Sequence, residues 1–273
     1  MRFPKRETDM RTRNALMETP GCAQSLCGAR LRRMSNIRRW HSFWLWMSVA
    51  IAVLVLALVA RSAAAQTERG TQIIERALAA EPDQLSGARI YRERCASCHG
   101  STAHGSADPV TPSLAGQQAL YLIKQMVDFA EGDRTAPEMH RVVALKELST
   151  PQAIRDVSSY LNRLPGNAQP ETGDGNNLAA GKRYYEGLCA YCHGQRGEGN
   201  EQHATPSLQR QHYSYLLMQS RRLAVGHRYS VPVEVIDALE QVPFYTLMAI
   251  ADYVSRLPQR ATTTAAAANE IRP

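Results

Sequence analysis

Residues 95–100, Cys-Ala-Ser-Cys-His-Gly, and residues 189–194, Cys-Ala-Tyr-Cys-His-Gly, decide how this chain is interpreted. A Cys-x-x-Cys-His run is the attachment motif of c-type haem. Two thiols add across the two vinyl groups of one porphyrin, and the histidine that follows binds the iron. The predicted haem-bonding residues are Cys95, Cys98, Cys189 and Cys192, and the predicted proximal iron ligands are His99 and His193.

Three other roles are open to a Cys-x-x-Cys pair: a redox dithiol, a disulfide, or half of a zinc site. A redox pair is expected near a strand–helix–strand pattern, which this sequence lacks. The two pairs are separated by 94 residues, from 95 to 189, whereas the halves of a zinc ribbon lie about 15–20 residues apart. The sequence therefore favours two covalently attached haem c groups, each with one iron.

The positive charge of the chain is concentrated in its first 65 residues. Lys and Arg outnumber Asp and Glu there by 11 to 3, and the rest of the chain holds 21 and 22. Because the basic excess is confined to this leader, nucleic acid is excluded as a partner.

A secretory signal is predicted within residues 1–65. Two arginines at 38–39 precede an apolar run from Trp44 to Ala60, and three alanines end at Ala65. This pattern predicts export to the periplasm with cleavage after Ala65. The alternative is an uncleaved anchor and association with the membrane, for which 17 apolar residues are near the lower limit.

Residues 1–33 do not resemble the start of a signal peptide, because they carry mixed charge, two cysteines and no helical pattern. Met34 would begin an ordinary signal peptide, so residues 1–33 are interpreted as a mis-assigned start. Cys22 and Cys27 leave with the leader. The mature chain then has no thiol outside the haem motifs, which suits an oxidising compartment.

A repeat of about 90 residues occurs twice in the mature chain. Identities recur at an offset of 94, for example Gly87 with Gly181 and Tyr91 with Tyr185. We expect a short N-terminal stretch, helical over 72–80, then two domains joined by a linker rich in Gly, Asn and Pro. The expected boundaries are 66–82 for the stretch, 83–165 and 177–258 for the domains, 166–176 for the linker and 259–273 for a flexible tail.

The periodicity of each repeat predicts an all-α fold. Asp83 and Asn177 are placed to cap the helix that leads to each haem motif. Thr150 and Pro151 begin the last helix of the first repeat. That helix has an apolar stripe at residues 154, 157, 161 and 164, which returns at residues 247, 250, 254 and 257.

These residues resemble class I cytochromes c, and their tandem arrangement resembles the two-haem cytochromes of the c4 kind. Besides the haem motifs, residues 111–117 (Thr-Pro-Ser-Leu-Ala-Gly-Gln) and 160–165 (Tyr-Leu-Asn-Arg-Leu-Pro) carry the resemblance. It implies two tandem domains, each wrapped around one covalent haem c. It also implies that the carbonyls of Pro112 and Pro206 accept a hydrogen bond from the proximal histidines, which orients each ring and raises its basicity.

The resemblance implies a Met thioether as the sixth ligand of each iron, and only the first repeat supplies one. Met139 stands in the expected loop, whereas Val233 holds the equivalent position in the second repeat. Haem two is therefore expected to be five-coordinate or bound by another side chain, for which His227 is the best candidate. The alternative is that His227 is a solvated loop residue. Without a thioether, haem two is expected to have the lower potential.

The resemblance implies a periplasmic electron carrier rather than an enzyme, and no catalytic residues are predicted. Its partners would be redox proteins of the respiratory chain, such as a membrane complex, an oxidase or reductase, or a dehydrogenase. Two alternatives stay open. Haem two could be an open site for small-ligand, peroxide or sulfur chemistry, or the protein could be an electron-transfer subunit of a larger dehydrogenase.

Overall fold

The computed structural model describes residues 24–228 and 230–258 of the chain. Contacts divide the chain into a first unit, residues 1–62, and a second unit, residues 63–273. The predictions for residues 1–23 and for the tail 259–273 lie outside the described residues.

Helix α1 (Gln24–Ala79) contributes to both units. Within the first unit, Phe43–Arg61 is long and apolar enough to cross a membrane, a property that signal sequences share. The helix expected over 72–80 is only the last part of α1. Residues 24–33 also belong to it, although they show no helical pattern, because no proline interrupts the chain between residues 24 and 79.

The first repeat forms five α-helices in the second unit, and we call residues 83–165 lobe 1. Its helices are α2 (Gln84–Arg94), α3 (Ala96–His99), α4 (Ala119–Glu131), α5 (Pro137–Val143) and α6 (Pro151–Arg163). A 3-10 turn at Lys146–Leu148 precedes α6.

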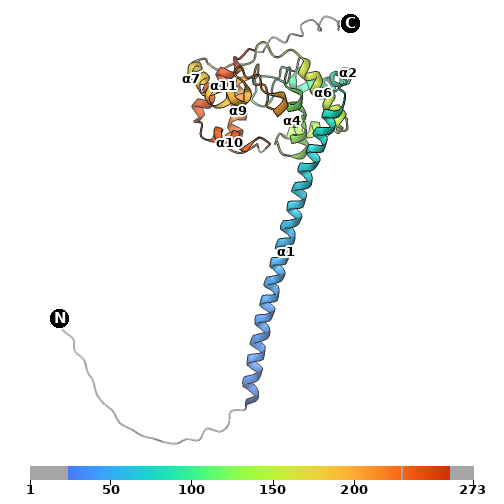
Figure 1. The fold of residues 1–273 in the computed structure, drawn as a ribbon, viewed down its shortest axis with the longest axis vertical. Coiled ribbons are helices and arrows are strands. Elements are labelled where there is room, and N and C mark those ends of the chain that lie inside the picture. Colours follow the sequence, from blue (N-terminus) through green and yellow to red (C-terminus); the bar gives the residue numbers. More distant parts are fainter. Residues whose placement is uncertain (1–23, 229, 259–273) are drawn as a thin grey trace, which may run out of the picture. The chain divides into compact units, whose positions relative to one another are not determined.

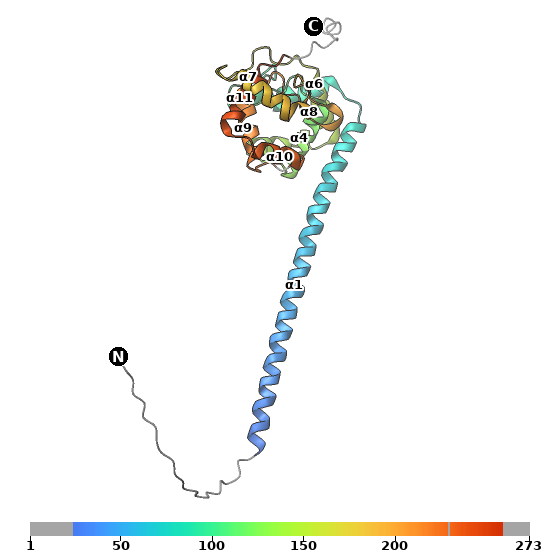
Figure 2. The ribbon, with the colours of Figure 1, turned by 60° about the vertical axis from the view of Figure 1, so that its left-hand side comes forward.

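The second repeat, residues 177–258 or lobe 2, follows the same order. Its helices are α7 (Leu178–Tyr184), α8 (Ala190–His193), α9 (Tyr213–Ala224), α10 (Val233–Glu240) and α11 (Phe244–Ser255). A π-helical turn at Tyr185–Cys189 joins α7 to α8, and Glu201–His203 is a 3-10 turn. In Figure 1, α7, α9, α10 and α11 lie together, beside α2, α4 and α6, and α7, α9 and α11 stay grouped in Figure 2.

The all-α prediction is confirmed for the described residues, where only two isolated β-bridges occur. Asp83 caps α2 by accepting hydrogen bonds from the N–H groups of Leu85 and Ser86. Thr150 caps α6 by accepting from the N–H of Ala153. Asn177 holds the N-cap position of α7 but makes no capping bond, because its backbone leaves the extended conformation that caps require.

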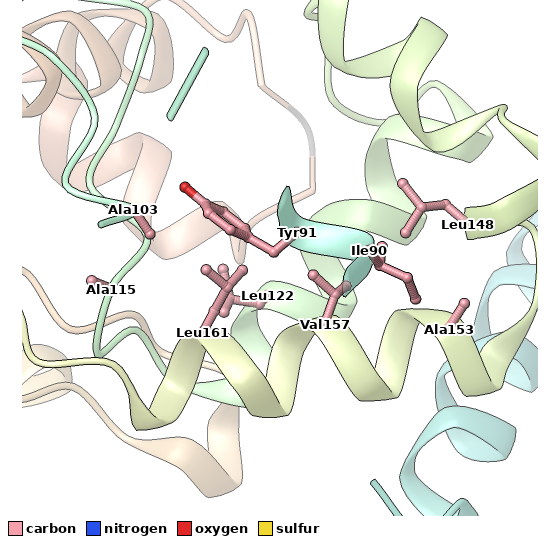
Figure 3. Packing of buried hydrophobic residues seen from close by; sticks show 9 residues of the cluster. All are labelled: Ile90, Tyr91, Ala103, Ala115, Leu122, Leu148, Ala153, Val157 and Leu161. Atoms are coloured by element: carbon pink, nitrogen blue, oxygen red, sulfur yellow. The ribbon is translucent and has the colours of Figure 1, made fainter. Parts of the chain in front are cut away.

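The core of lobe 1 lies between α2 and α6. Figure 3 shows Ala153, Val157 and Leu161 along one face of α6, directed at Ile90 and Tyr91 of α2. The predicted apolar stripes are confirmed, since residues 154, 157 and 161 are buried and residue 164 packs against the cluster. Residues 247, 250, 254 and 257 of lobe 2 are buried in the same way.

The end of α1 completes the core of lobe 1. Ala77 is fully buried, and Ile73 and Ile74 pack against a cluster on α4 and α6. The other buried members of this cluster are Ile123, Val127 and Ile154. A chain cleaved after Ala65 would keep this segment, so its packing is compatible with export.

Candidate haem sites

Each Cys-x-x-Cys-His motif forms a short helix, which follows α2 directly in lobe 1 and follows α7 through the π-helical turn in lobe 2. Cys95 ends α2 and begins α3, so Cys95 and Cys98 share one helical turn, and Cys189 and Cys192 are arranged in the same way. All four thiols are unpaired, with the first of each motif half-buried and the second exposed. This arrangement leaves both sulfurs of each motif available for bonding to one cofactor.

Burial, with a smaller contribution from the neighbouring thiol, raises the pKa of Cys95 and of Cys189 to about 11. Redox dithiols depend on a lowered thiol pKa, so the structure does not favour that alternative. Within residues 24–228 and 230–258, no three His, Cys, Asp or Glu side chains are grouped to hold a metal ion such as zinc.

The histidine that follows each motif is held by a backbone carbonyl. Nδ1 of His99 donates to the Pro112 carbonyl at 3.0 Å, and Nδ1 of His193 donates to the Pro206 carbonyl at 3.0 Å. Burial lowers the pKa of both rings, which keeps them neutral. With Nδ1 engaged as a donor, Nε2 is the nitrogen left to bind a metal.

A tyrosine from the preceding helix fixes the chain directly after each histidine. The Tyr91 hydroxyl donates to the Gly100 carbonyl, and the Tyr185 hydroxyl donates to the Gly194 carbonyl at 2.6 Å. Gly100 has φ +78° and Gly194 φ +81°, a conformation that other residues adopt only under strain. The glycine after each motif is therefore needed to turn the chain away from the histidine.

The candidates for the sixth ligand differ between the lobes. Met139 lies in α5 and is half-buried, so it is helical and not in the loop that was expected, because Pro137 begins a short helix there. Val233 begins α10 and is 60% exposed, and His227 is exposed in the loop before α10. Met248 is 38% exposed, as expected for a residue off the apolar stripe of α11.

A symmetric polar cluster joins the lobes and was not predicted from the sequence. Arg134 of lobe 1 donates to the hydroxyl of Tyr215 at 2.7 Å, and Arg228 of lobe 2 donates to the hydroxyl of Tyr121 at 3.1 Å. Both arginines also donate to Oε1 of Gln125 at 2.5 Å. The signal was present in the sequence, because each tyrosine and each arginine recurs at the offset of 94.

This cluster carries positive charge that the described residues do not balance. The acidic residue beside the cluster is Asp128, which accepts a hydrogen bond from Gln125. It is already paired with Lys124 at 2.7 Å. Arg228 is 6% exposed, and its Nε has no hydrogen-bond partner. Burial raises the pKa of Tyr121, but the two guanidinium groups outweigh it and lower that pKa, so the surroundings favour negative charge. Haem carries two carboxylates, and the guanidinium groups of Arg134 and Arg228 are suited to bind such negatively charged groups.

The family model described as cytochrome c matches residues 85–165 and 178–244, which include both motifs. The chain therefore belongs to the cytochrome c family. Cytochrome c4 of Azotobacter vinelandii is 34% identical over 146 residues, which cover 49% of this chain and 69% of that protein. The two matched domains and this relative define a cytochrome c4-like electron-transfer protein with two covalently bound haem c groups.

One solved structure shares the fold, and a further relative matches over more of the chain. The crystal structure of reduced recombinant cytochrome c4 from Pseudomonas stutzeri has the same fold, with a TM-score of 0.57 at 24% identity. The match covers 65% of this chain and 100% of the chain in that crystal structure. A protein of Stutzerimonas stutzeri named thiosulfate dehydrogenase electron acceptor is 27% identical over 203 residues, or 68% of this chain and 92% of that protein.

Proposed function

We propose that this protein carries single electrons between respiratory redox partners in the periplasm. The observation that carries the proposal is the presence of two equivalent haem motifs in one compact unit, whose lobes are joined by direct hydrogen bonds. When bound, each haem supplies one iron that takes up or releases one electron. The hydrogen bonds between the lobes would keep the two groups within the same unit.

The cysteines, the histidines and the two proline carbonyls have the same roles in both lobes, whereas the methionine occurs in lobe 1 alone. The four motif cysteines bond the haems covalently, and His99 and His193 bind iron through Nε2. The carbonyls of Pro112 and Pro206 keep each ring oriented and more basic. Met139 would supply a thioether to the iron of haem one, which would leave no position for a substrate there.

A second candidate function concerns haem two. Val233 replaces the thioether and lies exposed at the start of α10, so lobe 2 presents no methionine equivalent to Met139. An open iron position, or one closed by His227, would have a lower potential than haem one. An open position would suit small-ligand, peroxide or sulfur chemistry.

The relatives narrow the class of partner. One is named as the electron acceptor of a thiosulfate dehydrogenase. We therefore propose a dehydrogenase as electron donor and a membrane complex or terminal oxidase as acceptor. An electron-transfer subunit of a larger dehydrogenase would use the same two haem sites.

Electron paramagnetic resonance of the oxidised, haem-loaded protein tests the ligand assignment. We expect Met139→Ala to perturb one low-spin signal and to lower the potential of haem one by roughly 0.1–0.3 V, part of the ~0.8 V range that axial ligands set. Met218→Ala, a matched change in lobe 2, is expected to leave both signals in place. A high-spin signal in the unaltered protein would favour the open-site function for haem two, and an unperturbed Met139→Ala spectrum would exclude Met139 as a ligand.

The leader is expected to be removed on export. Intact-mass measurement of the protein from the periplasmic fraction should give a chain that begins at Gln66. Recovery of an uncleaved chain from the membrane fraction would support the anchor instead. A precursor that begins at Met1 would contradict translation from Met34.

A further inference from the structure

Two buried glutamines reach across from each lobe to the other in a reciprocal arrangement. Oε1 of Gln211, from lobe 2, accepts from the N–H of Ser113, and its Nε2 donates to the Ser113 carbonyl, both at 2.9 Å. Oε1 of Gln117, from lobe 1, accepts from the N–H of Ser207, and its Nε2 donates to the Ser207 carbonyl, again at 2.9 Å. The four distances are the same, so the two lobes make the same contact with each other in both directions.

Each glutamine touches the peptide group that holds a proximal histidine. The N–H of Ser113 and the carbonyl of Pro112 belong to one planar peptide, and that carbonyl accepts from Nδ1 of His99. One hydrogen-bonded chain therefore runs from Gln211 through this peptide to His99. The equivalent chain runs from Gln117 through the Pro206–Ser207 peptide to His193.

The side chains are fixed in place as well as bonded. Gln117 is 8% exposed and Gln211 is 6% exposed. Each Oε1 also accepts from the N–H of the next residue, Gln118 at 3.0 Å and His212 at 3.1 Å. Hydrogen bonds in a chain polarise one another, so an acceptor on the peptide N–H makes its carbonyl a stronger acceptor for the histidine.

We propose that Gln117 and Gln211 are positioning residues that make each haem site depend on the opposite lobe. Gln211 sets the basicity of His99, and Gln117 sets that of His193. The inference rests on the proposed role of these histidines as iron ligands. It goes beyond that role because the properties of each haem site would then depend on a side chain of the opposite lobe.

The test compares Gln211→Leu with Gln117→Leu in the haem-loaded, reduced protein. Nuclear magnetic resonance of ¹⁵N-labelled histidine reports the exchange rate of each Nδ1 proton. We expect Gln211→Leu to accelerate exchange at His99 roughly three- to tenfold, as loss of about one hydrogen bond implies, and to leave His193 unchanged. Gln117→Leu should do the reverse. In each variant the potential of the opposite haem should rise, because its histidine becomes a weaker donor to iron.

A control separates positioning from a general loosening of the interface. Ser214→Ala removes the 2.9 Å bond from the Ser214 hydroxyl of lobe 2 to the Ala107 carbonyl of lobe 1 and touches neither peptide, so both exchange rates should stay within about twofold. Gln211→Glu keeps an acceptor for the Ser113 N–H and is therefore expected to keep exchange at His99 slow. This variant replaces Gln211→Leu in the comparison if the leucine variant does not fold.

The inference would be overturned if the effects were confined to the mutated lobe, were equal in both lobes, or were reproduced by Ser214→Ala. Those results would leave the carrier proposal intact. By contrast, a His99 or His193 ring whose resonances lack a haem-induced shift would remove the ligand assignment itself.

Discussion

Gly181→Ala is expected to destabilise lobe 2 by about 3 kcal/mol or more, the upper range for overpacking. A Cβ at this position would lie 2.1 Å from the carbonyl oxygen of Ala249 and 2.9 Å from Cβ of Tyr253. The contact is with backbone, so no side-chain rotation relieves it, and α7 would have to separate from α11. Guanidinium denaturation of the haem-loaded protein, followed by far-UV circular dichroism, measures the change in the free energy of unfolding.

Gly187 supplies a matched control six residues away. A Cβ there meets no atom within 4 Å. Gly187→Ala is therefore expected to be neutral, or to stabilise the protein by up to about 1 kcal/mol, since alanine loses less backbone entropy than glycine. Equal destabilisation by the two changes would show that the approach of α7 to α11 is not what constrains Gly181.

The same approach recurs in lobe 1. A Cβ on Gly87 would lie 2.2 Å from the carbonyl oxygen of Asp156, on the helix equivalent to α11. This recurrence explains why both glycines appear in the sequence repeat. The repeat thus identified two residues of structural importance before their packing was known, although it did not reveal the reason.

The sequence predicted the elements whose signals are local. The caps at Asp83 and Thr150 and the stripe on α6 follow from residues within a few positions of one another. The bonds from His99 and His193 to the two proline carbonyls are present as the family resemblance implied. The caps and the stripe depend on short-range geometry, and the bonds to the proline carbonyls follow from a family motif with strict spacing.

The contacts between the lobes were not predicted, because they join residues far apart in the chain. Gln211 and Ser113 are separated by 98 positions, and Arg228 and Tyr121 by 107. The repeat marks these residues, since Gln117, Tyr121 and Arg134 recur at positions 211, 215 and 228, but it does not indicate which residue each one contacts. The packing of Ile73 and Ile74 against α4 was missed for the same reason, since only the partner surface shows that these residues are covered.

Removing both cysteines of the second motif, in Cys189→Ser/Cys192→Ser, is expected to lower the haem content from two to one per chain. The matched change in lobe 1 is Cys95→Ser/Cys98→Ser. Mass spectrometry of the denatured protein counts the covalently bound haems. Ser97→Ala, between the cysteines of the first motif, should keep both haems.

The loss of haem two should cost more stability than the loss of haem one. Apart from Met248, which lies off the apolar stripe of α11, the described residues include seven exposed large apolar side chains in lobe 2 and three in lobe 1. Those of lobe 2 are Tyr184, Leu188, Tyr191, Val225, Val233, Phe244 and Tyr245, and those of lobe 1 are Leu85, Val110 and Leu145. We therefore expect lobe 2 to depend more on a bound group to bury apolar surface, at ~25 cal/mol for each Å².

Thermal denaturation of the two double variants measures this difference. One kcal/mol shifts Tm by about 4–8 °C in a domain of this size, so we expect Tm to fall by more than about 10 °C when haem two is lost, and by less when haem one is lost. Equal falls would mean that the exposed side chains of lobe 2 serve another surface. A larger fall on loss of haem one would instead mean that haem one buries more apolar surface than haem two, although α1 already completes the core of lobe 1.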